Sequence, residues 1–272
     1  TAYPFLLSAM VGLVYFLFLA SNNSVGGPDP RQGLGKVIFA TVVLMELVLV
    51  CFIAPALTAG AISLERERQT YDLLRTTLLP ARSVVTGKLI SALAFLFLLL
   101  FTAFPLQSLA SLFGGVAVEE IIVSTILLIV TAFTYSALGL FFSSFIRRTL
   151  ASTVLAYVGA ILIVFGIPLL ILIVSSLGST VIFPSQNQFG IGAEILIYSV
   201  GWVVISANPL ATAIASEVML IERQTVFYTT LPLSNGSLFP VISPWISYSA
   251  FYLFLSGLLI LLSIGFVKKV DK

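Results

Sequence analysis

The chain alternates long apolar runs with short polar stretches. A transmembrane helix needs about 20 predominantly apolar residues, because the hydrocarbon core of a bilayer is about 30 Å thick. Six runs meet or nearly meet this length, and the pattern therefore predicts six membrane-spanning helices. The runs are 3–20, 37–63, 89–113, 121–145, 150–177 and 246–267. Pro55, Pro105 and Pro168 fall inside three of them, where neighbouring helices in a membrane make a kink tolerable.

The composition agrees with a protein whose solvent is lipid. Of the 272 residues, 59% are hydrophobic and 9% are charged, whereas soluble domains carry about 25% charged residues. The mean hydropathy is +1.15. The net charge of +2 gives no case for nucleic-acid binding. We therefore expect one all-α integral membrane domain over residues 1–272.

The distribution of basic residues predicts the orientation of the chain. Ten of the 13 Lys and Arg residues fall in loops on one predicted side, and three fall on the other. The first group is Arg66, Arg68, Arg75, Arg82, Lys88, Arg147, Arg148, Lys268, Lys269 and Lys272, and the second is Arg31, Lys36 and Arg223. Because cytoplasmic loops carry the excess of Lys and Arg, we predict that both termini are cytoplasmic.

The segment 178–245 precedes the last span and is more than a simple loop. Residues 191–206 are apolar enough to enter a membrane, Asn208-Pro209 follow, and 210–221 form a second, moderately apolar stretch. A single additional span would place the C-terminal lysines outside, against the charge bias. We therefore predict a re-entrant helical hairpin, with the polar remainder, such as 234–237, as an external loop.

The polar stretch 64–79 interleaves charged and apolar residues. Arg68 and Asp72 are spaced i,i+4, which supports a short helix. Ser63 is placed to cap its start and Pro80 to end it. On composition alone, this stretch is typical of an amphipathic helix at the membrane surface that connects two spans.

The order of residues in this loop resembles the cytoplasmic loop of ABC-2 type transporter permeases. Those loops commonly carry a Glu, a Thr, a Leu-Leu pair, a Pro, and a Gly-Lys that opens the third helix. The matching positions here are Glu67, Thr70, Leu73-Leu74, Pro80 and Gly87-Lys88. One departure is Gln69, where the family usually has glycine before the threonine. In the family this segment is the coupling helix, which seats in a groove of the ATPase subunit. The resemblance implies an ATPase-coupling role for Glu67, Arg68, Thr70, Tyr71, Leu74, Arg75, Leu78, Pro80, Gly87 and Lys88.

Other features of the chain resemble the same family. Six spans with both ends inside, and a long external segment with a re-entrant helical pair, are typical of it. Asn208-Pro209-Leu210 resembles an Asn-Pro-hydrophobic motif that often occurs there. The resemblance implies a multi-pass permease subunit of an ATP-driven exporter in the bacterial inner membrane. Its partners would be two ABC ATPase subunits, a second permease, identical or homologous, and membrane lipids, with the substrate pathway at the permease dimer interface.

The chain has no nucleotide-binding motif of its own. A P-loop reads Gly, four residues, Gly-Lys, then Ser or Thr. The nearest match ends at Gly87-Lys88 but has Arg82 and Leu89 at the first glycine and hydroxyl positions. Histidine is absent and Cys51 is the single cysteine, which excludes a zinc or copper site built from the usual ligands. We expect no enzyme activity and no cofactor in this chain, with ATP and magnesium bound by the partner ATPase.

Glu46 is the one carboxylate well inside a predicted span. It follows Lys36 by ten residues, which at about 1.5 Å per residue places it near the middle of the membrane. Two roles stay open: a polar site on the substrate path or at the permease–permease seam, and a structural carboxylate bonded to a neighbouring helix. Gln107 has the same two roles, and the structural one is favoured.

Two other functions remain as alternatives. The first is an ion-gradient-driven transporter or channel that uses Glu46 as its ion site. The second is a membrane scaffold or regulatory subunit that transports nothing.

Overall fold

The computed structural model describes residues 12, 30–70, 80–112, 114–177, 191–223, 225–234 and 236–270. The elements are α2 (Pro30–Thr58), α3 (Ser63–Glu67), α5 (Ala81–Leu112), α6 (Val118–Phe145), α7 (Thr149–Ile161), the π-helical turn η1 (Leu162–Gly166), α8 (Ile167–Leu177), α9 (Ile191–Ser206), α10 (Pro209–Arg223), β1 (Tyr228–Pro232), β2 (Leu238–Ile242) and α11 (Pro244–Val270). Within the described residues, five helices are long and apolar enough to cross a membrane, or up to six if the bent pair α9–α10 is one span. The fold is therefore that of an all-α membrane protein with one small β-hairpin.

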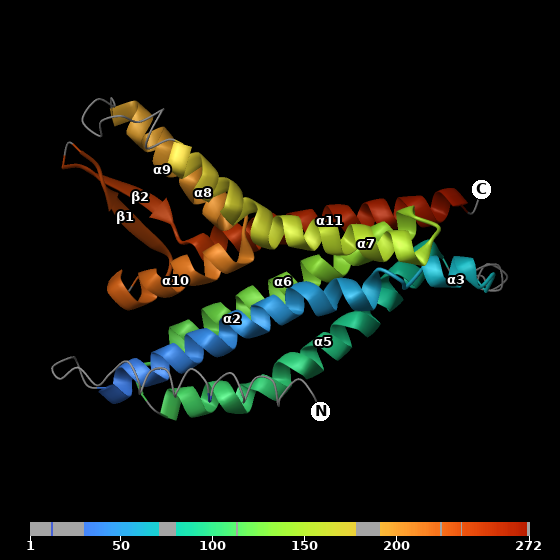
Figure 1. Ribbon diagram of the computed structural model, residues 1–272, viewed down its shortest axis with the longest axis horizontal. Coiled ribbons are helices and arrows are strands. Elements are labelled where there is room, and N and C mark those ends of the chain that lie inside the picture. The colour runs from blue at the N-terminus through green and yellow to red at the C-terminus, as the bar shows by residue number, and fades with distance from the viewer. Residues whose placement is uncertain are drawn as a thin grey trace.

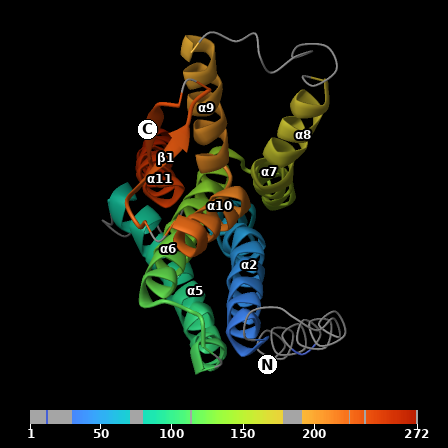
Figure 2. The same ribbon diagram turned by 90° about the vertical axis from the view of Figure 1, so that its left-hand side faces the viewer.

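Helix α6 lies at the centre of the bundle, with α2, α5, α7 and α11 packed around it (Figures 1 and 2). Small residues on α6 let its neighbours approach closely. At Gly139, an added Cβ would lie 3.0 Å from the Cα of Pro55 on α2. Such small residues are enriched where membrane helices pack, because backbone contact replaces the hydrophobic driving force that lipid does not supply.

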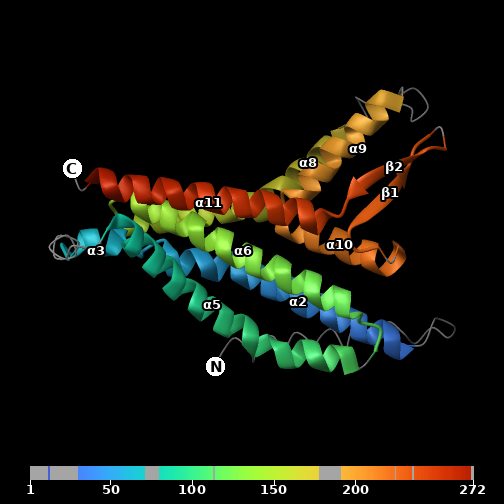
Figure 3. The same cartoon turned by 180° about the vertical axis from the view of Figure 1, so that it is seen from behind.

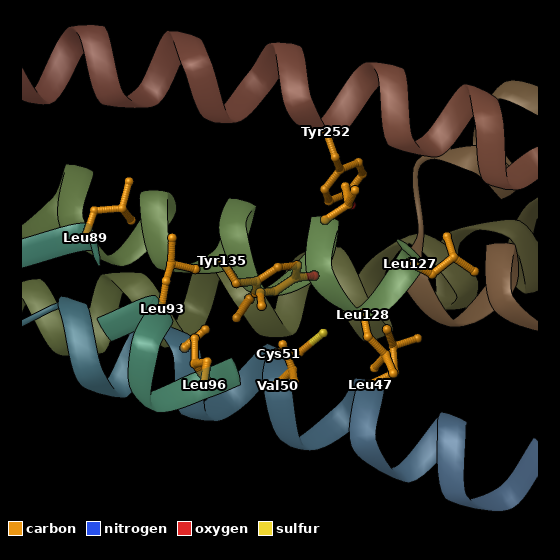
Figure 4. Close-up of a cluster of buried hydrophobic side chains, with 14 of the residues drawn as sticks. Leu47, Val50, Cys51, Leu89, Leu93, Leu96, Leu127, Leu128, Tyr135 and Tyr252 are labelled. Atoms are coloured by element: carbon orange, nitrogen blue, oxygen red, sulfur yellow. The ribbon is translucent and has the colours of Figure 1, made fainter. Parts of the chain in front are cut away.

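The core is a cluster of apolar side chains from α2, α5, α6 and α11 (Figure 4). Tyr135 of α6 and Tyr252 of α11 are among its largest fully buried members. Cys51 of α2 is also fully buried, as its apolar surroundings in the sequence predict. The outer faces of the helices are apolar as well, with Phe101 and Leu98 among the exposed side chains. Such a surface needs lipid or a protein partner to cover it.

The bundle has two ends with different contacts (Figure 3). At one, called the α3 end, the Phe145 and Phe266 rings lie 5.1 Å apart, so α6 and α11 finish side by side near α3. At the other, called the Lys36 end, Lys36 Nζ lies 3.9 Å from Glu120 Oε1, so α2 and α6 begin together. The described members of the larger basic group lie at the α3 end, in agreement with the grouping that the sequence predicts.

Five of the six predicted spans correspond to described helices, and the run 3–20 lies outside the described residues. The helices are longer than the apolar runs. Helix α5 begins at Ala81 rather than at residue 89. Gly87-Lys88, predicted to open this helix, therefore lie inside it. An apolar run marks only the part of a helix that contacts lipid. The helix itself can continue into water, because its backbone hydrogen bonds do not depend on apolar side chains.

The segment before the last span contains the two predicted short helices. The chain bends by 114° between α9 and α10, as it does in a broken span or in a re-entrant loop. The chain then forms a β-hairpin that the sequence analysis did not predict, with Tyr228 opposite Ile242. Its turn includes Gly236 at a φ of 80°, a conformation that glycine adopts without strain. The described residues of the predicted loop 234–237, which are 234, 236 and 237, thus lie in the turn between β1 and β2.

Candidate functional site

The segment from Ala59 to Thr70, called here the coupling segment, links α2 to the stretch that the resemblance predicts to contact an ATPase. Helix α3 ends within it. The amide of Thr70 donates to Glu65 O at 3.0 Å, and the amide of Gln69 donates to Arg66 O at 3.2 Å. With Gln69 at a φ of 58°, this is a Schellman motif, which closes a helix through a left-handed residue. The prediction of one helix over 64–79 is therefore wrong at residues 68–70, and 71–79 lie outside the described residues.

The start of α3 is capped from α6 and not by Ser63. Ile62 occupies the N-cap position and supplies no side-chain cap. Ser143 Oγ of α6 instead accepts hydrogen bonds from the amides of Ile62, at 2.9 Å, and Ser63, at 3.1 Å. The Ser63 hydroxyl donates back to Ala59 O. The free N–H groups at the start of a helix require such partners when they are buried.

The coupling segment is also fastened to the corner between α6 and α7. Arg66 Nη1 donates to Ser144 O at 2.8 Å. The amide of Thr149, the first residue of α7, donates to Glu67 Oε1 at 3.1 Å. A carboxylate at a helix N-terminus satisfies a free amide and complements the helix dipole. Glu67 therefore caps α7.

A third contact joins the coupling segment to α5. Lys88 Nζ donates to Glu65 Oε1, and the two side chains form an ion pair. Through Glu65, Glu67 and Ser143, the coupling segment is fixed to α5, α7 and α6 in turn. The coupling segment is thus bonded to three helices of the bundle.

Glu46 lies fully buried between α2 and α5. Gln107 Nε2 of α5 donates to Glu46 Oε2 at 2.6 Å. The other carboxylate oxygen of Glu46 has no hydrogen-bond partner among the described residues. The pair joins two helices inside the subunit and does not reach its surface, which supports the structural role for both residues. A role for Glu46 on the pathway or at the dimer seam stays a prediction.

One comparison with known proteins decides the family. The model of the ABC-2 family transporter protein matches residues 6–267. The chain belongs to this family. None of the curated proteins searched matches it. As an ABC-2 family transporter protein with several apolar helices, it is a multi-pass membrane protein.

The stretch Asn208-Pro209-Leu210, which resembles an Asn-Pro-hydrophobic motif of ABC-2 transporters, forms the joint between α9 and α10. Asn208 Oδ1 accepts from the amide of Ala211 at 2.8 Å and so caps α10. Pro209 occupies the first position of that helix, where its missing N–H costs nothing. The motif thus begins a new helix immediately after the bend.

The amide group of Asn208 also binds the fifth predicted span. Its Nδ2 donates to Ile163 O at 2.7 Å and to Val164 O at 2.9 Å, both in the π-helical turn η1. Pro168 has no N–H to offer, either to Val164 O four residues earlier, as in an α-helix, or to Ile163 O five residues earlier, as in a π-helical turn. Asn208 therefore donates to the two carbonyls that Pro168, farther along the same helical segment, cannot serve.

A tyrosine pair holds the same joint from the other side. Tyr252 OH of α11 donates to Ala207 O at 2.8 Å, directly before Asn208. The ring of Tyr248 stacks on that of Tyr252 with centroids 4.1 Å apart. Tyr248 OH and Thr131 Oγ1 of α6 lie 2.7 Å apart. The bend is consequently bonded to η1 and to α11, and α11 in turn to α6.

The predicted ATPase-coupling residues of this ABC-2 transporter protein fall into three groups. Glu67 and Lys88 make the internal contacts described above. Arg68, Thr70 and Pro80 are exposed, and an added Cβ at Gly87 would meet open space. The remaining residues, Tyr71, Leu74, Arg75 and Leu78, lie outside the described residues. The coupling role of the set stays a prediction.

Gln69 has a left-handed backbone, at a φ of 58°, at the position where the resemblance to the family's loop implies a glycine. An L-residue in this region costs about 1–2 kcal/mol relative to glycine. We expect Gln69→Gly to stabilise the protein by about 1 kcal/mol in reversible unfolding in mixed micelles. Gln69→Ala, which keeps the Cβ, is the control and should leave stability unchanged. A Gly variant no more stable than the Ala variant would contradict the argument.

Proposed function

We propose that this chain is the permease subunit of an ATP-driven ABC exporter in the bacterial inner membrane. It pairs with a second permease, identical or homologous, and the substrate pathway lies at their interface. Two separate ATPase subunits bind and hydrolyse ATP. The family match supports the permease role, and the resemblance of residues 67–88 to the family's coupling loop supports the ATPase partnership.

The observation that carries the proposal is the way the coupling segment is fastened. In the proposed mechanism, ATP binding closes the ATPase pair and moves the loop beyond Thr70. A loop on a flexible tether would dissipate that movement. Here the short helix α3, which precedes that loop, is fixed to α6 through Ser143, to α7 through Glu67 and to α5 through Lys88. The movement therefore reaches the membrane helices as a displacement of rigid rods.

Co-purification with an ATPase tests the proposal. Affinity purification of the tagged chain from its own membranes is expected to recover a protein that contains a P-loop. The double substitution Leu74→Asp, Arg75→Glu should reduce its recovery and the transport-linked ATP hydrolysis by about tenfold or more, because it reverses charge and removes apolar contact within the proposed docking segment.

The matched control is Leu238→Asp on β2, an exposed leucine of the hairpin. It makes the same leucine-to-aspartate exchange on a part of the chain outside the proposed contact. Unchanged ATPase recovery is expected for this variant. Recovery of no ATPase by the wild-type chain, or equal recovery by the double variant, would remove the basis for an ATP-driven exporter.

A further inference from the structure

Two cavities lie one above the other along the crease between α2 and α10. The first, of about 160 Å³, is almost entirely apolar and is lined by residues such as Val43 of α2 and Ile214 of α10, with Glu217 on its wall. The second, of about 280 Å³, lies where the start of α6 meets the crease and is lined by Lys36, Glu119 and Glu120 together with small and apolar residues such as Ala117 and Leu220. The crease thus offers an apolar compartment and a charged one.

The two compartments are adjacent. Lys36 of the charged cavity and Ala40 of the apolar one are four residues apart on α2, and Ile221 and Glu217 have the same relation on α10. Four residues are about one helical turn. Glu217 is also close enough for the charges of Glu120 and Lys36 to act on it. A single ligand of modest size can therefore span both compartments.

The charged compartment has acceptors that lack donors. The side chain of Glu120 is only 3% exposed, and Lys36 approaches it no closer than 3.9 Å. Glu120 Oε2 has no hydrogen-bond partner among the described residues, and the same holds for Glu217 Oε1. Buried carboxylate oxygens without donors are costly. A ligand that brings N–H groups and positive charge would relieve this cost.

The chemistry of the walls narrows the class of ligand. Across the two cavities, three carboxylates face a single lysine among the described side chains. The described residues include no group of three or more His, Cys, Asp or Glu that could hold a metal ion. Ile214 and Val218 line the apolar compartment and have exposed side chains, so this compartment borders the surroundings of the bundle.

We propose that an alkylammonium ligand binds in this crease, with its N–H groups at Glu120 and Glu217 and its apolar chain between α2 and α10. The ligand chemistry is a primary or secondary amine with an apolar body. An aminophospholipid and a free amphiphilic amine both present this chemistry. Binding needs no ATPase and no transport, so it is tested separately from the proposed permease function.

Octylammonium titrated into the purified protein in lipid nanodiscs is the test. Saturable binding is expected by calorimetry, whereas octanol, with the same chain and no charge, should show none. Glu217→Gln and Glu120→Gln should each weaken binding by about tenfold, because each removes one charge–charge contact. Lys36→Gln should tighten it by a similar factor, since it removes the competing cation.

Opposite effects of nearby substitutions separate ligand binding from loss of structure. The matched control is Glu194→Gln, a carboxylate on α9 that accepts hydrogen bonds from Ser234 in the hairpin and lies outside the crease. It should bind octylammonium as the wild type does. Equal binding by the Glu120→Gln, Glu217→Gln double variant, or equal binding of octanol, would overturn the proposal.

Native mass spectrometry identifies the source of the amine. Retention of phosphatidylethanolamine, but not phosphatidylcholine, by the wild type and its loss in the double variant would assign the site to a lipid headgroup with N–H donors. Binding of octylammonium without lipid retention would assign it to a free amine. Absence of both would refute the site.

Discussion

Replacing Gly139 with alanine is expected to destabilise the protein by about 2–3 kcal/mol, the upper part of the range for overpacking a core, which is about 1–3 kcal/mol. The added Cβ would fall 2.1 Å from Thr58 Oγ1 and 3.0–3.1 Å from the Pro55 backbone. The Thr58 hydroxyl can rotate away, at the loss of its hydrogen bond to Ala54 O. The Pro55 backbone cannot, so α2 and α6 must separate along the central packing interface of the bundle.

Reversible unfolding in mixed micelles measures this effect. Gly257→Ala on α11 is the matched control, because an added Cβ there meets nothing within 4 Å. In an open helical position, alanine should stabilise by about 0.5–1 kcal/mol relative to glycine. If the two variants changed stability in the same direction and by the same amount, the close approach at Gly139 would not matter energetically.

Replacing Asn208 with alanine is expected to lower the free energy of unfolding by about 3 kcal/mol. The substitution removes the cap of α10, worth about 1 kcal/mol, and leaves the carbonyls of Ile163 and Val164 without their donor, at about 1 kcal/mol each. Asn208→Ser keeps an acceptor for the Ala211 amide but not the two amide donors. Asn208→Ser should therefore lower the free energy of unfolding less than Asn208→Ala does, by about the 1 kcal/mol that the cap contributes.

A double-mutant cycle with Pro168 tests the reason given for the Asn208 contact. Pro168→Ala restores an N–H that Val164 O, four residues earlier, or Ile163 O, five residues earlier, can accept within the same helical segment. In that background Asn208→Ala should cost measurably less than in the wild type. Additive effects of the two substitutions would show that Asn208 does not act by replacing the donor that Pro168 lacks.

The membrane helices were predictable because each lipid-facing segment needs an unbroken apolar run of known length. The same signal places the ends of helices poorly, and α5 therefore starts eight residues before its predicted span. The hairpin had a usable signal. Asn235-Gly236 is a dipeptide typical of tight β-turns, and residues of high strand propensity flank it on both sides. Hydropathy does not detect it, because two strands of five residues are too short to register as a span.

Contacts between distant segments were beyond the sequence alone. Pro168 indicates that a carbonyl in the preceding turn lacks its usual backbone donor. Because buried backbone groups are almost always paired, that carbonyl must have a donor elsewhere. That donor is Asn208, 40 residues after Pro168, and only the folded chain brings the donor and the carbonyl together. The cap of α3 by Ser143 is of the same kind. At Gln69 the sequence did carry a signal, because glycine at that position in the resembled family points to a left-handed backbone.

The length of α6 gives its attachment at Ser143 a geometric consequence. Ser143 lies near one end of this helix and Glu120 near the other, about 35 Å apart at about 1.5 Å per residue. If α6 pivots as a stiff rod about Ser143, a tilt of about 5° carries Glu120 sideways by about 3 Å, close to the length of a hydrogen bond. Under such a rotation, a movement too small to disturb packing at the α3 end would make or break contacts at the Lys36 end, because displacement grows with distance from the pivot.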